Sequence, residues 1–126
     1  MKVSLCLVKQ AASSDHLVFE SERLRWNIFD KGTQRKSGTV QPYNFLSAEL
    51  VGEDDAVLSR KILTLFSAFS VVGTVATFLE QAQASDAWVR VEIPSTSDES
   101  RDCNLGPDEV KLLAKLNLGL EFWFVD

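Results

Sequence analysis

Residues 87–94 read AWVRVEIP and residues 105–125 read LGPDEVKLLAKLNLGLEFWFV, and these two stretches decide the fold. Apolar and polar residues alternate in the first stretch, which predicts a strand with one apolar face. Pro94 ends this strand, because proline has no N–H to donate to a neighbouring strand. The apolar face carries Ala87, Val89, Val91 and Ile93, and the opposite face carries Trp88, Arg90 and Glu92.

A capped helix and a final strand follow. Gly106 is a tolerable N-cap, and Pro107 suits the first helical position. The acids Asp108 and Glu109 suit the positive end of the helix dipole. Alternation over Leu120–Val125 predicts the last strand. The helix is expected to bury Val110, Leu113, Ala114 and Leu116 and to end in a left-handed cap at Asn117 or Gly119.

The rest of the chain reads as strands first and helices second. A long helix is expected to begin at the acidic Gly52–Asp55, and a second helix follows a kink near Gly73. Strands are predicted at Lys2–Val8, Leu17–Phe19, Arg23–Phe29 and Tyr43–Val51. The first helix carries its buried stripe at Leu58, Ile62, Leu65, Phe66 and Phe69 and its polar side at Arg60, Lys61, Thr64 and Ser67.

Segregated strands and helices are typical of an α+β fold. We predict one domain, residues 1–126, with a mainly antiparallel sheet and about three helices packed on one face.

The composition, 45% hydrophobic and 25% charged over 126 residues, is typical of a globular protein. No apolar run is long enough for a secretory leader or a bilayer span, so we expect a cytoplasmic protein with no membrane partner. Residues 1–61 hold nine Lys or Arg and eight Asp or Glu, a net charge of +1, whereas residues 62–126 hold four and ten, a net charge of −6. This uneven field favours a basic partner.

No catalytic apparatus is recognisable. His16, the only histidine, is interpreted as a surface residue, and Cys6 and Cys103 as free thiols outside any nucleophile or zinc motif. We therefore predict a non-enzymatic protein with no metal and no cofactor, an enzyme using carboxylates being the weakest alternative. The basic stretch Arg23–Lys36 contains Asp30 and does not predict nucleic-acid binding.

Alternation places several aromatic residues on the sheet face that the helices leave bare: Tyr43, Phe45, Trp88 and Trp123. Aromatic groups framed by charges are typical of protein-binding surfaces. Three explanations remain open: a bound partner, a homodimer, or coverage by a Leu17–Phe29 hairpin. The predicted partner-binding residues are Trp88, Glu92, Asp98, Glu99, Asp102, Glu121 and Trp123.

The stretch over residues 105–125, with the KGTQRKSG loop at residues 31–38, resembles a bacterial family of small domains of unknown function. Members of that family join a helix start of leucine, small residue, proline and acid to a terminal strand of alternating aromatics. In size and acidity the chain is also similar to cytoplasmic immunity proteins, which neutralise toxins from neighbouring bacteria. This likeness implies a non-catalytic immunity protein that holds a basic toxin domain such as a nuclease. The alternative is a regulatory or scaffold domain that binds a small ligand or self-associates.

Overall fold

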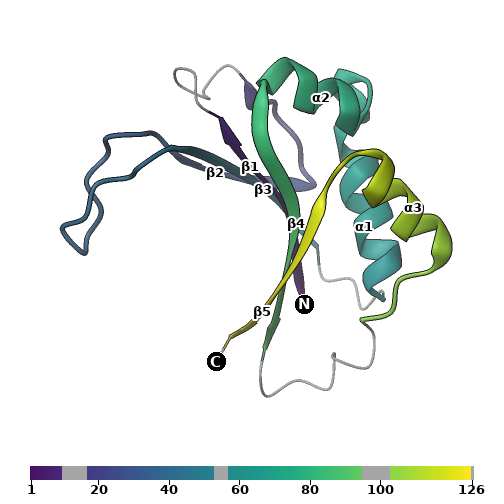
Figure 1. The fold of residues 1–126 in the computed structure, drawn as a ribbon. Coiled ribbons are helices and arrows are strands. Elements are labelled where there is room, and N and C mark those ends of the chain that lie inside the picture. The colour runs from purple at the N-terminus through teal and green to yellow at the C-terminus, as the bar shows by residue number, and fades with distance from the viewer. Residues whose placement is uncertain (10–16, 53–56, 95–102, 126) are drawn as a thin grey trace.

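A mixed five-stranded sheet carries its helices on one face (Figure 1). The computed structural model of the chain describes residues 1–9, 17–52, 57–94 and 103–125. The strands are β1 (Lys2–Lys9), β2 (Leu24–Phe29), β3 (Asn44–Leu50), β4 (Ala84–Pro94) and β5 (Gly119–Val125). The helices are α1 (Leu58–Ser67), the 3-10 helix η2 (Ala68–Val72), α2 (Val75–Ala82) and α3 (Pro107–Lys115). The prediction of a single α+β domain is confirmed.

The strand order is β2-β3-β1-β4-β5, so the first strand lies in the centre and β2 and β5 form the edges. Neighbouring strands are antiparallel except β4 and β5, which are parallel. A parallel pair needs a crossover connection, and α3 supplies it between β4 and β5. The sheet is therefore mainly antiparallel, as predicted, with one parallel pair at the β5 edge.

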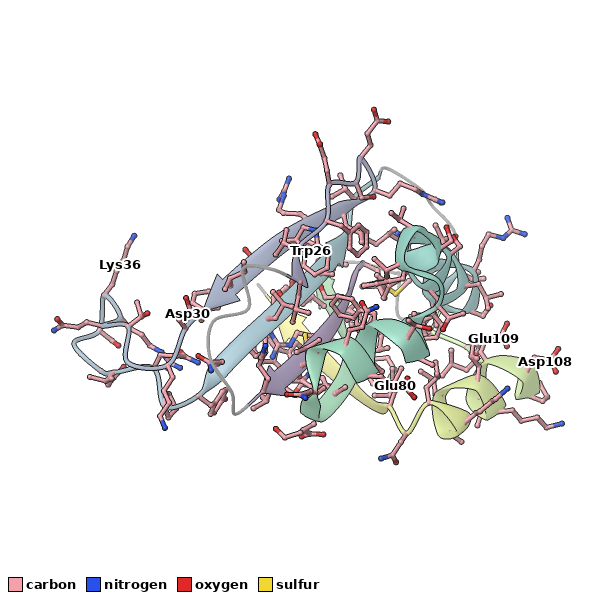
Figure 2. All side chains as sticks on the ribbon, turned by 90° about the horizontal axis from the view of Figure 1, so that it is seen from above. Trp26, Asp30, Lys36, Glu80, Asp108 and Glu109 are labelled. Atoms are coloured by element: carbon pink, nitrogen blue, oxygen red, sulfur yellow. The ribbon has the colours of Figure 1, made fainter. Side chains whose placement is uncertain are left out.

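The core lies between the sheet and the helices. Leu65 and Phe69 are fully buried there, as the stripe of the first helix predicts, and so is Phe78 of α2. Trp26 points into the same layer (Figure 2), and its Nε1–H donates to the carbonyl of Phe19 at 3.0 Å. The rings of Phe19 and Trp26 meet edge to face with centroids 5.2 Å apart. Phe19 and Trp26 are partly buried, and aromatic pairs of this geometry stabilise a core beyond the area that they bury.

The predicted strand at Leu17–Phe19 is wrong. These residues lie outside any strand, and Phe19 packs on Phe69 and Phe78 as well as on Trp26. The apolar character of this segment comes from its place in the core, because a short apolar run does not distinguish a strand from a buried loop.

Helix α1 begins later than predicted, at Leu58, and its first turn carries no acid. The residues Glu53–Ala56, which include the acids of the predicted start, lie outside the described residues. Lys61, predicted on the solvent side, is buried with 8% of its surface exposed. The reason is that α1 packs beside the start of β1, where the Lys61 Nζ donates to the carbonyl of Met1 at 3.3 Å.

The predicted kink is confirmed at Gly73, which has a φ of +107° that favours glycine. Thr74 then caps α2, its side-chain oxygen accepting from the backbone N–H of Thr77 at 3.1 Å. No single helix of the described residues is long and apolar enough to cross a membrane. Leu58–Val72 and Val75–Ala82 pass that test only as a pair bent by 63°.

Helix α3 has the predicted start, with Gly106 as N-cap and Pro107 in the first turn, and Figure 2 shows Asp108 and Glu109 at that end. Of the two predicted left-handed positions, Asn117 adopts it, with a φ of +54°. The expectation that Val110 and Ala114 are buried is wrong, since Val110 is 51% exposed and Ala114 is exposed. The helix lies at the rim of the core and buries only a narrow stripe that includes Leu113.

Residues 30–43, between β2 and β3, project from the body as an arm (Figure 1). Its tip is a tight turn in which the N–H of Arg35 donates to Thr39 at 2.7 Å and that of Gly38 donates to Arg35 at 2.9 Å. Lys36 lies at this tip, far from Asp108 and Glu109 (Figure 2). The basic tip of the arm and the acidic start of α3 are thus widely separated.

Candidate binding surface

The face of the sheet opposite the helices, here called the outer face, carries a large aromatic side chain on each of four of its described strands. Phe29, Phe45, Trp88 and Trp123 come from β2, β3, β4 and β5, and we call them the aromatic row. The ring centroids of Phe29 and Phe45 are 6.0 Å apart, as are those of Phe45 and Trp88. Since β1 lies between β3 and β4, the second contact passes over the central strand.

Arg90 joins the last member of the row to the others. Its guanidinium carbon lies 3.8 Å from the ring centroid of Trp123 and 5.7 Å from that of Phe45. A cation over an aromatic face is attracted by the ring quadrupole. Arg90 therefore holds the rings of β3 and β5 in place from between them.

Glu121 completes this arrangement. Its Oε1 accepts from the Nε–H of Arg90 at 2.7 Å and from the Nε1–H of Trp88 at 3.3 Å. The first contact is a charge-assisted hydrogen bond, which is shorter and stronger than a neutral one. The side chains of Trp88, Arg90 and Glu121 consequently form one connected polar and aromatic cluster.

The parallel register of β4 and β5 explains why these residues meet. Arg90 is paired with Glu121, and Glu92 is paired with Trp123. Paired residues of neighbouring strands point to the same face. The extended side chain of Arg90 then reaches Trp123, two positions along β5.

A large part of the row is open to solvent. Phe29 is 48% exposed, Trp123 is 43% exposed, and Tyr43 beside them is 42% exposed. None of the described helices lies over this face (Figure 1). The hypothesis that a Leu17–Phe29 hairpin covers it is wrong, because Phe19 packs on the opposite side of the sheet.

The sequence-predicted residues are only partly brought together. Trp88, Glu121 and Trp123 meet in the cluster around Arg90. Glu92 lies on the same face, beside Trp123 in the register. The remaining predictions, Asp98, Glu99 and Asp102, lie outside the described residues, as does His16.

Sequence reasoning missed two contributors, Phe29 and the central role of Arg90. The signal for Phe29 is present, since alternation that sends Trp26 and Ile28 inward sends Phe29 outward. No local signal identifies Arg90 as the central residue, because its contacts depend on the pairing of β4 with β5.

The base of the arm adds a hollow next to the row. A cavity of about 320 Å³ is lined by Phe29, Arg35, Gln41, Tyr43, Phe45 and Arg90. Gln41 shapes it, since its side-chain oxygen accepts from the Nε–H of Arg35 at 2.9 Å and its amide donates to the carbonyl of Tyr43 at 2.9 Å. The outer face therefore combines a hollow with projecting aromatic groups.

Cys6 lies on the outer face of β1, between Ser47 and Trp88 in the register, as alternation predicts. It is nevertheless fully buried. Burial raises the pKa of its thiol from 9.0 to about 12, against a smaller lowering effect of Arg90. The thiol therefore stays protonated at neutral pH, and the thiolate needed for nucleophilic chemistry is strongly disfavoured.

Comparison with family models, with curated proteins and with solved structures found no match to this chain. The family resemblance described above stays a prediction.

Proposed function

We propose that this chain is a protein-binding domain that holds its partner on the aromatic row, and that it serves as a cytoplasmic immunity protein against a basic toxin domain. The observation that carries the proposal is the ordered cluster of Trp88, Arg90 and Trp123, in which the Trp123 side chain is 43% exposed. Tryptophan and arginine are, with tyrosine, the residue types most enriched among those that dominate binding energy. Contacts to Glu121 and to the neighbouring rings order these side chains, which lowers the entropy lost on binding.

The charge of the chain supports a basic partner. The net charge is −5, and the half of the sequence that forms β4, α3 and β5 carries the excess of acids. Opposed charges raise the rate of association, whereas a desolvated aromatic centre slows dissociation. Electrostatics and the aromatic row would thus act on different rate constants.

Self-association is the second candidate, favoured by the edge strand β5. Its residues Phe122, Trp123, Phe124 and Val125 are all more than one third exposed. A sheet edge has unpaired backbone N–H and C=O groups that can pair with another strand. In that case the chain would be a scaffold domain whose partner is a second copy.

The test uses the product of the gene directly upstream of the one that encodes this chain, where that product is a large secreted protein with a toxin-like C-terminal domain. We expect the purified toxin domain to bind the chain, and co-expression of the chain to restore growth. Trp123→Ala should accelerate dissociation by roughly 30-fold or more, since truncating a central tryptophan typically costs about 2 kcal/mol or more. Phe124→Ala is the matched control, because Phe124 is 67% exposed on the same strand but points to the other face.

The predicted acidic loop gives a second arm. Reversal of Asp98, Glu99 and Asp102 to lysine should slow association and weaken its dependence on salt, with dissociation nearly unchanged. Equal dissociation rates for Trp123→Ala, Phe124→Ala and the parent would contradict the assignment of the surface. A concentration-dependent dimer in sedimentation, with no toxin binding, would favour the scaffold function instead.

A further inference from the structure

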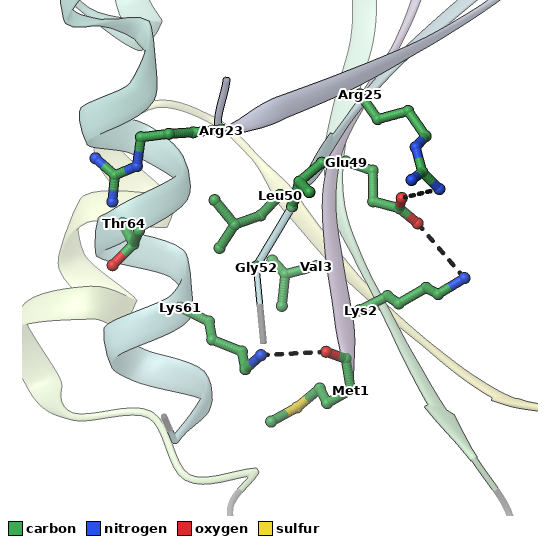
Figure 3. Close-up of a pocket in the computed structure, with 11 residues that line it drawn as sticks. Met1, Lys2, Val3, Arg23, Arg25, Glu49, Leu50, Gly52, Lys61 and Thr64 are labelled. Carbon is green, nitrogen blue, oxygen red and sulfur yellow. Dashed lines mark hydrogen bonds and ion pairs between the residues drawn. The ribbon is translucent and has the colours of Figure 1, made fainter. Parts of the chain in front are cut away.

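A second cavity, unrelated to the aromatic row, lies between α1 and the adjacent ends of β1, β2 and β3 (Figure 3). Its volume is about 430 Å³. Small-molecule sites commonly have volumes of roughly 300–1,000 Å³, so this one is large enough for a small ligand. Val3 and Leu50 give it an apolar wall, whereas Arg23, Lys61 and Thr64 lie along its α1 side (Figure 3).

The lining is strongly cationic. Among the described residues it includes Lys2, Arg23, Arg25 and Lys61 but a single carboxylate, that of Glu49. Glu49 is already engaged on the sheet side, with its oxygens 3.8 Å from Lys2 Nζ and 3.5 Å from Arg25 Nη1. The positive charges on the α1 side are therefore not neutralised by Glu49.

Lys61 is the most informative of these residues. Its side chain is buried, and the contact that holds its ammonium group is a neutral backbone carbonyl, that of Met1, at 3.3 Å. A buried ammonium has three N–H donors and is costly without an opposing charge. Arg23 is exposed, and its Nη1 likewise donates to a neutral group, the hydroxyl of Ser67, at 3.4 Å.

We propose that this cavity binds a small organic anion, whose phosphate or carboxylate group lies between Lys61 and Arg23 and whose apolar body lies against Val3 and Leu50. Thr64 is three residues after Lys61, so both lie on the same side of α1. Figure 3 shows Thr64 on α1 between Lys61 and Arg23, and its hydroxyl is a further donor on this side of the cavity. The ligand supplies the negative charge that the described residues on the α1 side of the lining lack.

The experiment is an amide NMR titration of the full chain, without an added tag, using phenyl phosphate, benzoate, inorganic phosphate and neutral phenol. We expect saturable shifts around Arg23, Leu50 and Lys61 with one of the two organic anions, and none with phenol. The stronger of the two organic anions identifies the acid group. Inorganic phosphate should bind several-fold more weakly than phenyl phosphate if that is the preferred ligand, because it lacks the apolar body.

Substitutions locate the site. Lys61→Met keeps the aliphatic stem and should weaken binding by about tenfold, since a hydrogen bond to a charged group is lost. Thr64→Val should weaken it by a few-fold and is the second variant if Lys61→Met does not fold. Lys115→Met on α3 is the matched control, because Lys115 does not line this cavity and its loss changes the net charge equally.

Three results would overturn the proposal. One is the absence of saturable shifts up to about 20 mM, the range in which weak ligands are still detected. Another is an equal loss of binding in Lys115→Met and Lys61→Met, which would indicate a nonspecific charge effect. The third is binding seen only after Glu53→Gln, Asp54→Asn and Asp55→Asn are combined. It would mean that these acids, which lie outside the described residues, neutralise the cavity themselves.

Discussion

Replacement of Arg90 by methionine tests whether the aromatic row is a rigid, ordered surface. Methionine keeps an unbranched apolar stem of similar reach but removes the guanidinium. The change abolishes the stacking on Trp123, at 3.8 Å from the ring centroid, and the hydrogen bond to Glu121, at 2.7 Å. It also leaves Glu121 without its cationic partner.

The expected loss of stability follows from the exposure of these groups. The Arg90 side chain is only 19% exposed, so its cation–π contact is worth about 1–2 kcal/mol. Glu121 is 39% exposed, and solvent screening reduces the ion pair to about 1 kcal/mol or less. The free energy of unfolding should therefore fall by about 2 kcal/mol.

Urea unfolding followed by far-ultraviolet circular dichroism measures this loss without relying on tryptophan fluorescence. Arg25→Met is the control, because Arg25 is 65% exposed and its ion pair with Glu49, at 3.5 Å, should contribute less than about 0.5 kcal/mol. A double-mutant cycle with Trp123→Leu should give a coupling energy of about 1 kcal/mol. Coupling below about 0.3 kcal/mol, or an equal loss in Arg25→Met, would refute the role given to Arg90.

Three further predictions concern the core, the buried thiol and the helix cap. Leu65→Ala should cost about 2–5 kcal/mol in urea unfolding because Leu65 is fully buried, whereas Leu63→Ala, at a site 47% exposed, should cost less than about 1 kcal/mol. The raised pKa of Cys6 means that only the unfolded state loses this proton between pH 9.0 and about 12, so stability falls as pH rises through that range. The free energy of unfolding of Cys6→Ala should fall less steeply with pH than that of the parent, by up to about 1.4 kcal/mol per pH unit. Parallel curves of this free energy against pH for the two proteins would contradict the assignment. Asn117→Gly should leave the melting temperature nearly unchanged, and Asn117→Val should lower it, at a cost of about 1–2 kcal/mol, because Asn117 has a left-handed φ of +54°.

Most local features of this chain are predictable from its sequence. The alternation in β4, the cap at Gly106 and the kink at Gly73 all follow from the geometry of a few consecutive residues. Alternation also assigns each side chain of a strand to one face, so it identifies aromatic residues of the outer face from the sequence alone. These predictions hold because strand and helix periods are properties of the backbone itself.

The errors occur where a residue's surroundings come from a distant part of the chain. Lys61 is polar and periodicity predicts it on the solvent side, yet the start of β1 covers it. Val110 is apolar and periodicity predicts it in the core, yet α3 lies too far toward the rim to bury it. Hydrophobic periodicity identifies a face of a helix, but it does not tell how much of that face a neighbour covers.

By itself, the sequence determined the α+β class, the main elements and the side of the sheet on which each outer-face residue lies. Only the tertiary structure decided that Arg90 lies between Phe45 and Trp123, and that Arg23 and Lys61 share a cavity. The physical reason is that the residues in each of these pairs lie about 30 to 45 positions apart in the sequence. They depend on the register of β4 with β5 and on the packing of α1 against the sheet, which no local pattern of residues specifies.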